Sequence, residues 1–172
     1  VPMGACLISD KIFSEISGEH SQDSSFSNGY TYSGHPVAAV AALKNMEIIE
    51  EEGLLEHVRQ VSPQFQNRLH ELRKLPLVGD TRGAGLIGCV ECKIVDPDNP
   101  KALEIDHEMG ALIDSHCQEL GLIVRPLLNM CVFSPPLIIN SEQIDEMFNL
   151  LERGILEATE DLRRQGFWKD MQ

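Results

Sequence analysis

The pattern of hydrophobic and polar positions divides the chain into helical and extended segments. Apolar residues recur at spacings of three and four in four stretches, as in amphipathic helices: residues 36–52, 54–75, 105–120 and 144–162. Three other stretches are apolar and irregular or alternating, which predicts β structure: residues 78–94, 122–124 and 131–139. From residue 78 onward, the predicted order is β-α-β-β-α, which is typical of a compact two-layer unit.

Local signals predict where the helices begin and end. Pro36 favours the first turn of the first helix, because the amide that it lacks has no partner there. Pro63 lies inside the second helical pattern and predicts a kink or break near that position. Gly121 closes the third helix, and Asn140 with Gln143 predicts a capping box at the start of the last one.

The segment before residue 76 predicts the end of a different, larger domain. Residues 5–9 form a short apolar run that predicts a buried strand, and residues 11–27 predict a helical turn followed by a polar loop. The first half of the 36–52 helix is apolar nearly all round, which predicts packing on several sides. Its buried candidates are Val37, Val40, Ala41, Met46 and Ile49.

Composition and charge exclude several classes of protein. The 172 residues are 42% hydrophobic and 24% charged, as in ordinary globular proteins. A net charge of -13 and a pI near 4.8 argue against a surface that binds nucleic acid or an anionic membrane. No apolar stretch is long enough to span a bilayer. The first residues fit neither a signal peptide nor a translation start, so we expect a processed chain or a fragment.

The cysteines predict buried free thiols in a reducing compartment, and therefore a cytoplasmic protein. There are five of them, an odd number, scattered through apolar stretches. Cys89 and Cys92 form a C-x-x-C, but residues three apart on a strand point to opposite faces. No second pair completes a zinc site, so we expect no metal.

Two further motifs fail on their context. Residues 83–88 match G-x-G-x-x-G, but the dinucleotide motif must open a helix, whereas the residues that follow here alternate like a strand. Ser33 with His35 has no third group that the sequence nominates for a catalytic triad. His107 and His116 lie on a predicted helix, where packing or solvation is the ordinary state of a histidine.

The polar, glycine-bearing run from residue 27 to residue 38 has the clearest chemistry. It places hydroxyl groups and backbone amides beside the start of a helix, which suits an anion such as a phosphate. The block Gly29–Ala38 also resembles the phosphate-contacting loop of class III (ω-) pyridoxal-phosphate aminotransferases. Three more segments resemble that family in the same order: residues 1–5, the R-G-x-G-L pattern of residues 78–86, and residues 121–127 with 134–137.

This resemblance implies an α/β fold, the C-terminal part of a fold-type-I transferase that depends on pyridoxal phosphate (PLP). Residues 1–76 would hold the end of the large domain and the linking helices, and residues 77–172 the small domain. Thr31, with backbone contact from Tyr30, would bind the cofactor phosphate of a neighbouring subunit, which implies a homodimer. The alternative for Thr31 is a loop hydroxyl that makes only local bonds.

Arg125 is similar to the family's mobile arginine, which pairs with the carboxylate of an amino or keto acid. A guanidinium suits this role because its planar fork meets a carboxylate bidentately. The alternative is an arginine paired with surface carboxylates. Leu128 departs from the family, in which many members carry a glycine soon after the Arg-Pro pair, so it could narrow the pocket or alter the loop.

The resemblance also implies that the Schiff-base lysine lies a few residues before Val1, so no residue of this chain is nominated as catalytic. The favoured function is transfer of an amino group from an amine or ω-amino acid to pyruvate or a similar keto acid, with this chain as the C-terminal portion. Two alternatives stay open. One is another reaction on the same platform, an aminomutase or decarboxylase, and the other is a non-catalytic binding or dimerisation module.

Overall fold

A computed structural model describes residues 3–17, 29–93 and 99–168. The chain divides into two compact units, Val1–Gly53 and Leu54–Gln172. The domain boundary expected between residues 76 and 77 concerns a larger protein and stays a prediction. No helix of the described residues is long and apolar enough to cross a membrane.

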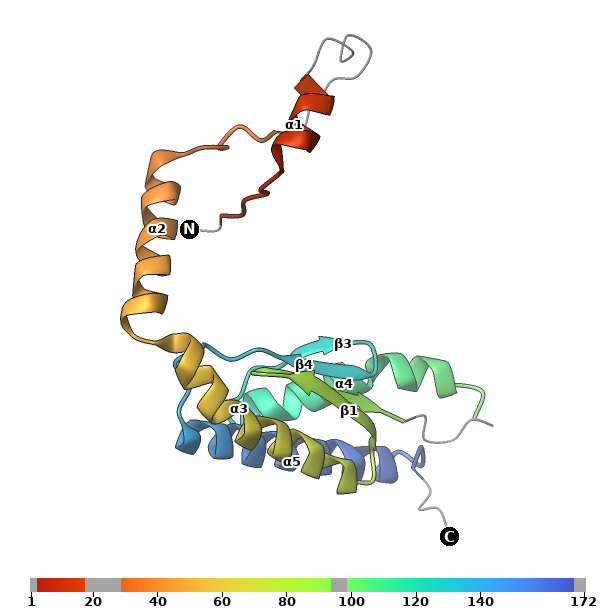
Figure 1. The fold of residues 1–172 in the computed structure, drawn as a ribbon. Helices are drawn as coiled ribbons and strands as arrows, with labels where there is room; N and C mark the ends of the chain where they lie inside the picture. The colour runs from red at the N-terminus through yellow and green to blue at the C-terminus, as the bar shows by residue number, and fades with distance from the viewer. Residues whose placement is uncertain (1–2, 18–28, 94–98, 169–172) are drawn as a thin grey trace. The chain divides into compact units, whose positions relative to one another are not determined.

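The described residues of the first unit form two helices, α1 (Asp10–Ser17) and α2 (Pro36–Glu51), drawn in red and orange in Figure 1. The strand predicted at residues 5–9 is wrong, because residues 3–9 are exposed and carry no strand. A strand needs the backbone of a neighbour to pair with its amides and carbonyls, and no described segment offers one there. Cys6 is therefore exposed, contrary to the expectation that the cysteines are buried.

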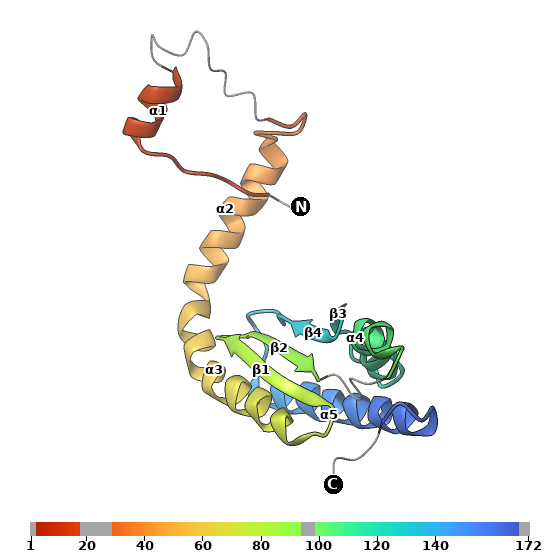
Figure 2. The ribbon, with the colours of Figure 1, turned by 90° about the vertical axis from the view of Figure 1, so that its right-hand side faces the viewer.

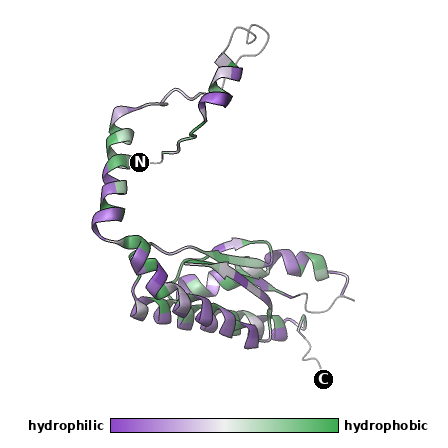
Figure 3. Ribbon diagram, in the orientation of Figure 1, coloured by the Kyte–Doolittle hydropathy of each residue, from purple (hydrophilic) through white to green (hydrophobic). Residues whose placement is uncertain are grey.

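Helix α2 begins at Pro36 as predicted, but none of its residues is buried. Hydrophobic colour covers much of its first half in Figure 3, and Val37 and Val40 are 63% and 66% exposed. The burial predicted for them, and for the three other candidates of this helix, is wrong within this unit. An apolar helix surface is buried only where another surface covers it, and the described residues of Val1–Gly53 provide none.

The second unit is a four-stranded antiparallel sheet with three long helices on one face (Figures 1 and 2). The strands are β1 (Val78–Ala84), β2 (Ile87–Cys92), β3 (Arg125–Leu127) and β4 (Met130–Phe133), in the order β1-β2-β4-β3. The helices are α3 (Leu54–Glu71), α4 (Ala102–Glu119) and α5 (Ser141–Arg164), and a short 3-10 turn, η2 (Leu72–Lys74), follows α3. The predicted two-layer unit is confirmed.

Its first β segment is a hairpin rather than one strand. Gly85, at φ 59°, lies in the turn between β1 and β2, a left-handed conformation that glycine adopts without strain. Thr81 and Val90 face each other across the hairpin and are buried, whereas their neighbours point outward. The glycines of residues 83–88 thus form a turn and allow close packing.

Three phenylalanines join the sheet to the helices. Phe65 of α3 lies edge-on to Phe148 of α5, with ring centroids 5.1 Å apart, and Phe133 of β4 packs against both at 6.4 and 6.2 Å. Phe65 and Phe148 are fully buried. Aromatic rings contribute large buried areas and favour these tilted arrangements, so this cluster is the centre of the core.

Helix α5 matches its sequence signals closely. Asn140 Oδ1 accepts the amide of Gln143 at 2.9 Å, and Gln143 Oε1 accepts the amide of Asn140 at 3.1 Å, so the capping box is confirmed. The predicted apolar stripe faces the core, with Met147 partly buried, and hydrophilic colour dominates the visible side of α5 in Figure 3.

Of the kink or break predicted near Ser62, the break is wrong, because α3 continues through Pro63 to Glu71. Pro63 removes one hydrogen bond from the carbonyl of Arg59, four residues earlier. Both residues are exposed, so water can satisfy that carbonyl and the helix goes on.

The strand predicted at residues 122–124 lies three residues later, in β3. Its partner β4 offers Met130–Phe133, and the register pairs Arg125 with Val132 and Leu127 with Met130. β3 is an edge strand, which tolerates Pro126 because one side of its backbone is unpaired. The apolar residues 122–124 stay outside the sheet.

Leu128 and Asn129 form the two-residue turn between β3 and β4. Leu128 has φ 56°, the one positive φ of a non-glycine residue in the described ranges. The favoured two-residue hairpin turns need such a φ at their first position, where glycine, asparagine or aspartate is usual. The Leu128 carbonyl accepts the Gly110 amide at 2.9 Å, and the Asn129 carbonyl accepts the Cys92 amide at 2.9 Å. These bonds hold the strained turn in place.

Three cysteines lie in the core as free thiols, and burial is the largest cause that raises their pKa values. The pKa of Cys92 rises to about 12 and that of Cys117 to about 11, and the pKa of Cys131 rises as well. Each of these thiols is at most 3% exposed. Cys89 is half-buried, and burial also raises its pKa.

These thiols predict a loss of stability in alkali. Above about pH 9 the thiols ionise in the unfolded chain while they stay neutral in the folded one, so the unfolded state binds fewer protons. The free energy of unfolding should then fall by about 1.4 kcal/mol per pH unit for each buried thiol, up to its folded pKa. Urea unfolding from about pH 8 to about pH 11 measures the slope. Cys117→Ala should make the dependence of the free energy of unfolding on pH shallower, and the exposed control Cys6→Ala should not. Equal slopes for both variants would show that the buried thiol of Cys117 does not cause this dependence.

The strained turn predicts that Leu128→Gly stabilises the second unit by about 0.5–1 kcal/mol. The free-energy cost of a leucine in the left-handed conformation exceeds the entropic cost of the extra backbone freedom that glycine gives the unfolded chain. Leu137→Gly is the matched control, because Leu137 is also exposed but has no positive φ, and it should lower stability. Thermal unfolding of the two variants checks this, and a loss of stability in both would show that the turn is unstrained.

Candidate functional site

The loop before α2 is closed by its own hydrogen bonds. The amide of Ser33 donates to the Tyr30 carbonyl at 2.9 Å, and the amide of Tyr30 donates to Ser33 Oγ at 3.0 Å. Gly34, at φ 70°, turns the chain towards the helix, and the ring of His35 lies edge-on to that of Tyr32. Ser33 and His35 therefore build a turn, and Ser33 Oγ already accepts a backbone bond.

Thr31 lies at the exposed side of this turn. No described residue hydrogen bonds its amide or its hydroxyl, so the local bonds that were the alternative for Thr31 are not seen there. The side chain of the preceding Tyr30 is 81% exposed. The loop thus presents a hydroxyl and an amide that a ligand can bind.

The start of α2 adds positive potential next to the loop. His35 is the capping residue, and its side chain makes no capping bond. Pro36 occupies the first helical position, and the amides that follow have no earlier carbonyl to bind. Because the helix dipole is positive at this end, the loop and helix start fit an anion such as a phosphate.

In the second unit, Arg125 lines a pocket of about 620 Å³. The pocket lies between the β3 edge and the start of α5, and its walls are mostly apolar. Ile123 and Ile138 are exposed members of those walls, and Ser134 and Gln143 are polar ones. A mostly apolar cavity with a few polar groups is typical of a small-molecule site.

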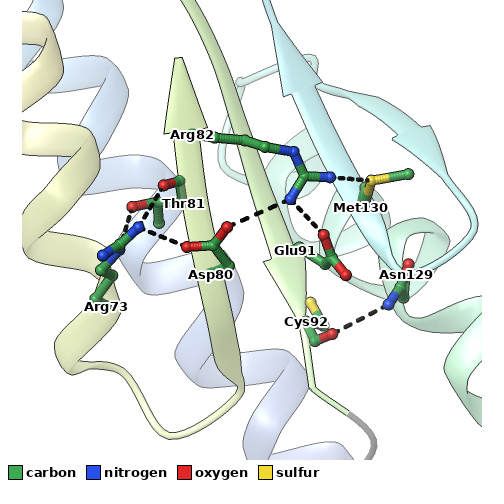
Figure 4. Close-up of polar contacts among 8 residues, drawn as sticks. All are labelled: Arg73, Asp80, Thr81, Arg82, Glu91, Cys92, Asn129 and Met130. Carbon is green, nitrogen blue, oxygen red and sulfur yellow. Dashed lines mark hydrogen bonds and ion pairs between the residues drawn. The ribbon is translucent and has the colours of Figure 1, made fainter.

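Among the described residues, the Arg125 guanidinium has no carboxylate partner, so the alternative of a surface ion pair is not seen. Two other arginines, Arg82 of β1 and Arg73 of η2, are paired, as Figure 4 shows. Arg73 Nη2 lies 2.5 Å from Asp80 Oδ1, and Arg82 Nη1 bonds Glu91 and lies 3.5 Å from Asp80 Oδ2. The bond to Glu91 is the main cause that raises the pKa of Arg82.

The structure places the predicted site residues in two different parts of the chain. Tyr30 and Thr31 belong to the first unit and Arg125 to the second, so their separation is not defined. Leu128 does not line the Arg125 pocket. Of the two effects expected for Leu128, the structure therefore shows the one on the loop, through its left-handed backbone.

Sequence reasoning missed the polar network around Arg82 and the apolar walls of the pocket. The sequence did contain a signal for the network around Arg82, because Asp80 and Arg82 are two residues apart on a strand and so share a face. The partner Glu91 needed the hairpin register. The pocket walls come from three segments, and their exposed isoleucines look like ordinary loop residues in the sequence.

The glycine-rich motif and the C-x-x-C lie in the strand context that the sequence predicted for them. The glycine-rich residues 83–88 enter a strand and open no helix. On β2, Cys92 faces the core and Cys89 the opposite side. His116 packs between α4 and α5, where its Nε2 lies 2.9 Å from Asp161 Oδ2. Within the described ranges, no three potential metal ligands come together.

The comparisons with known proteins all identify the same family. The family model for "Aminotransferase class-III" matches residues 1–155. The putrescine–pyruvate aminotransferase of Pseudomonas aeruginosa is 38% identical over 89% of this chain and 32% of its own length. The mitochondrial gamma-aminobutyrate transaminase 1 of Oryza sativa subsp. indica is 35% identical over 94% of this chain and 31% of its own.

A solved structure agrees with these relatives. The structure described as "Transaminase with L-ala" superposes with a TM-score of 0.76 at 38% identity, over 90% of this chain and 36% of the other. The chain therefore spans about a third of the length of the proteins that it matches. The expected α/β fold, part of a fold-type-I transferase, is confirmed. By sequence and by fold, the chain belongs to the class-III aminotransferase family.

Proposed function

We propose that the complete polypeptide containing this sequence transfers an amino group from an amine or ω-amino acid to pyruvate or a similar keto acid. The observation that carries the proposal is Arg125, which lines a mostly apolar pocket and has no carboxylate partner among the described residues, in a member of this family. A planar guanidinium binds a carboxylate bidentately, and the apolar walls can take the body of the acid. Two relatives support the substrate class, since their names give putrescine with pyruvate and gamma-aminobutyrate.

The proposed cofactor is PLP, which supplies the electron sink for amino transfer when bound. The loop before α2 fits its phosphate, because the amide and hydroxyl of Thr31 have no hydrogen-bond partner among the described residues and the helix start has no side-chain cap. Tyr30 adds backbone contact. We further propose a homodimer in which Thr31 contacts the cofactor phosphate held by the neighbouring subunit.

The residues of this chain would bind and orient the substrate rather than move protons. Arg125 holds a carboxylate against the pocket and, being exposed and unpaired among the described residues, can swing away for an uncharged group at little cost. We assign no catalytic base to this chain. A cytoplasmic location is part of the proposal and rests on the free thiols of its buried cysteines.

Thr31→Ala in the complete polypeptide tests the cofactor loop. Loss of one hydrogen bond to a charged phosphate should weaken PLP binding about tenfold or more. A titration of PLP followed by its absorbance measures this, and Thr31→Ser is the control that keeps the hydroxyl. Unchanged affinity in Thr31→Ala would remove Thr31 from the site, and a folded parent that binds no PLP would leave the non-catalytic module as the better function.

Arg125→Met tests the substrate pocket. The KM for pyruvate should rise about thirtyfold, the size of a lost charge-assisted contact, while a neutral aldehyde acceptor should react as before. Steady-state kinetics with both acceptors measure the difference. Arg153→Met is the matched control, since Arg153 is an exposed arginine of α5 away from the pocket. If the KM for pyruvate is unchanged in Arg125→Met, its proposed role is wrong.

A further inference from the structure

The outer face of the sheet carries a row of four side chains that ends in two arginines. The register pairs Arg82 with Cys89, Cys89 with Val132, and Val132 with Arg125, across all four strands. Directly paired residues of antiparallel strands point to the same face. Because buried Thr81, Val90 and Cys131 point towards the helices, this row points away from them.

The two arginines differ in their partners. Arg82 bonds Glu91 and lies beside Asp80, and Asp80 is also held by Arg73 (Figure 4). Arg82 Nη2 further lies 3.2 Å from Met130 Sδ, so its guanidinium spans β1, β2 and β4. Arg125, at the other end of the row, has no carboxylate partner in the described residues. Among the described residues, Asp80 and Glu91 are therefore both engaged, whereas Arg125 is not.

Glu91 lies within reach of Arg125. It is paired with Met130, which is paired in turn with Leu127, two residues beyond Arg125 on β3. Two strand spacings are about 10 Å, and two residues along a strand about 7 Å. The long side chains of a glutamate and an arginine can bridge such a separation across an open face. Glu91 is thus a potential competitor for the guanidinium that the substrate carboxylate needs.

We propose that Arg82 is a positioning residue for substrate binding: by holding Glu91, it keeps Arg125 free for the substrate carboxylate. This inference rests on the proposed function of Arg125. The Arg82 and Glu91 side chains are 51% and 38% exposed, so their own pairing adds little to stability. The pairing matters because it makes the Glu91 carboxylate contact Arg82 instead of Arg125.

The experiment replaces Arg82 in the complete polypeptide. Arg82→Met should raise the KM for pyruvate about fivefold, the strength of one competing surface ion pair, with kcat unchanged at saturation. The KM for a neutral aldehyde should stay the same. Arg82→Met/Glu91→Gln should restore the KM for pyruvate, because the competing charge is gone, and Arg82→Lys should keep it near that of the parent. A merely structural role of Arg82 would predict neither the rescue nor the dependence on substrate charge.

Arg73→Met is the matched control. It removes a cation of similar exposure from the same network and leaves Glu91 paired, so the KM for pyruvate should not change. An equal rise in Arg73→Met, or a rise in Arg82→Met that Glu91→Gln fails to reverse, would overturn the proposal.

A crystal structure of Arg82→Met tests the same point without activity. The Glu91 carboxylate should lie within about 4 Å of the Arg125 guanidinium, the range of an ion pair. A Glu91 side chain that stays clear of Arg125 would overturn the inference even if the enzyme transaminates. A parent without transaminase activity would refute the proposed function, and the crystal structure would still decide whether Arg82 keeps the two groups apart.

Discussion

The second unit depends on the burial of one face of its sheet. Phe65, Phe133 and Phe148 tie α3, β4 and α5 into one aromatic cluster, and the inward residues of the strands pack around it. Side chains alternate along a strand, so covering one face with helices leaves the other face for polar chemistry. The same constraint that builds the core therefore lines up Arg82, Cys89, Val132 and Arg125 on the outside.

Core packing also explains how the strained turn between β3 and β4 persists. Gly110 of α4 approaches so closely that a Cβ there would lie 2.6 Å from the carbonyl oxygens of Leu128 and Met130. The hairpin thus rests on the helix backbone itself, and the Gly110 amide fixes the Leu128 carbonyl. A left-handed leucine survives because the surrounding bonds determine its backbone, and β3, which begins with Arg125, is held in register as a result.

The sequence predicted the elements whose signals are local. Helix α5 has its capping box and its apolar stripe within its own residues, so both could be read directly. Strands and buried faces depend on partners. Among the described residues, no strand neighbours residues 5–9 and nothing covers α2 within its unit. The strand expected at 122–124 lies instead at Arg125–Leu127, because β4 sets the register. Arg125 was found through the family motif, whereas the pairing of Arg82 with Glu91 needed the hairpin alignment.

Because the chain is strongly acidic, an exposed arginine such as Arg125 will tend to form an ion pair with one of the protein's own carboxylates. With 27 acidic and 14 basic residues, an arginine of this chain has carboxylates in excess around it. An exposed cation in such a field attracts them over roughly a Debye length, about 10 Å, so an anionic substrate competes with the protein's own side chains. A guanidinium stays open to substrate only where nearby carboxylates are engaged by other cations. Arg73 and Arg82 engage Asp80 and Glu91 here, so the carboxylate binding that we propose for the pocket would depend on residues that do not line it.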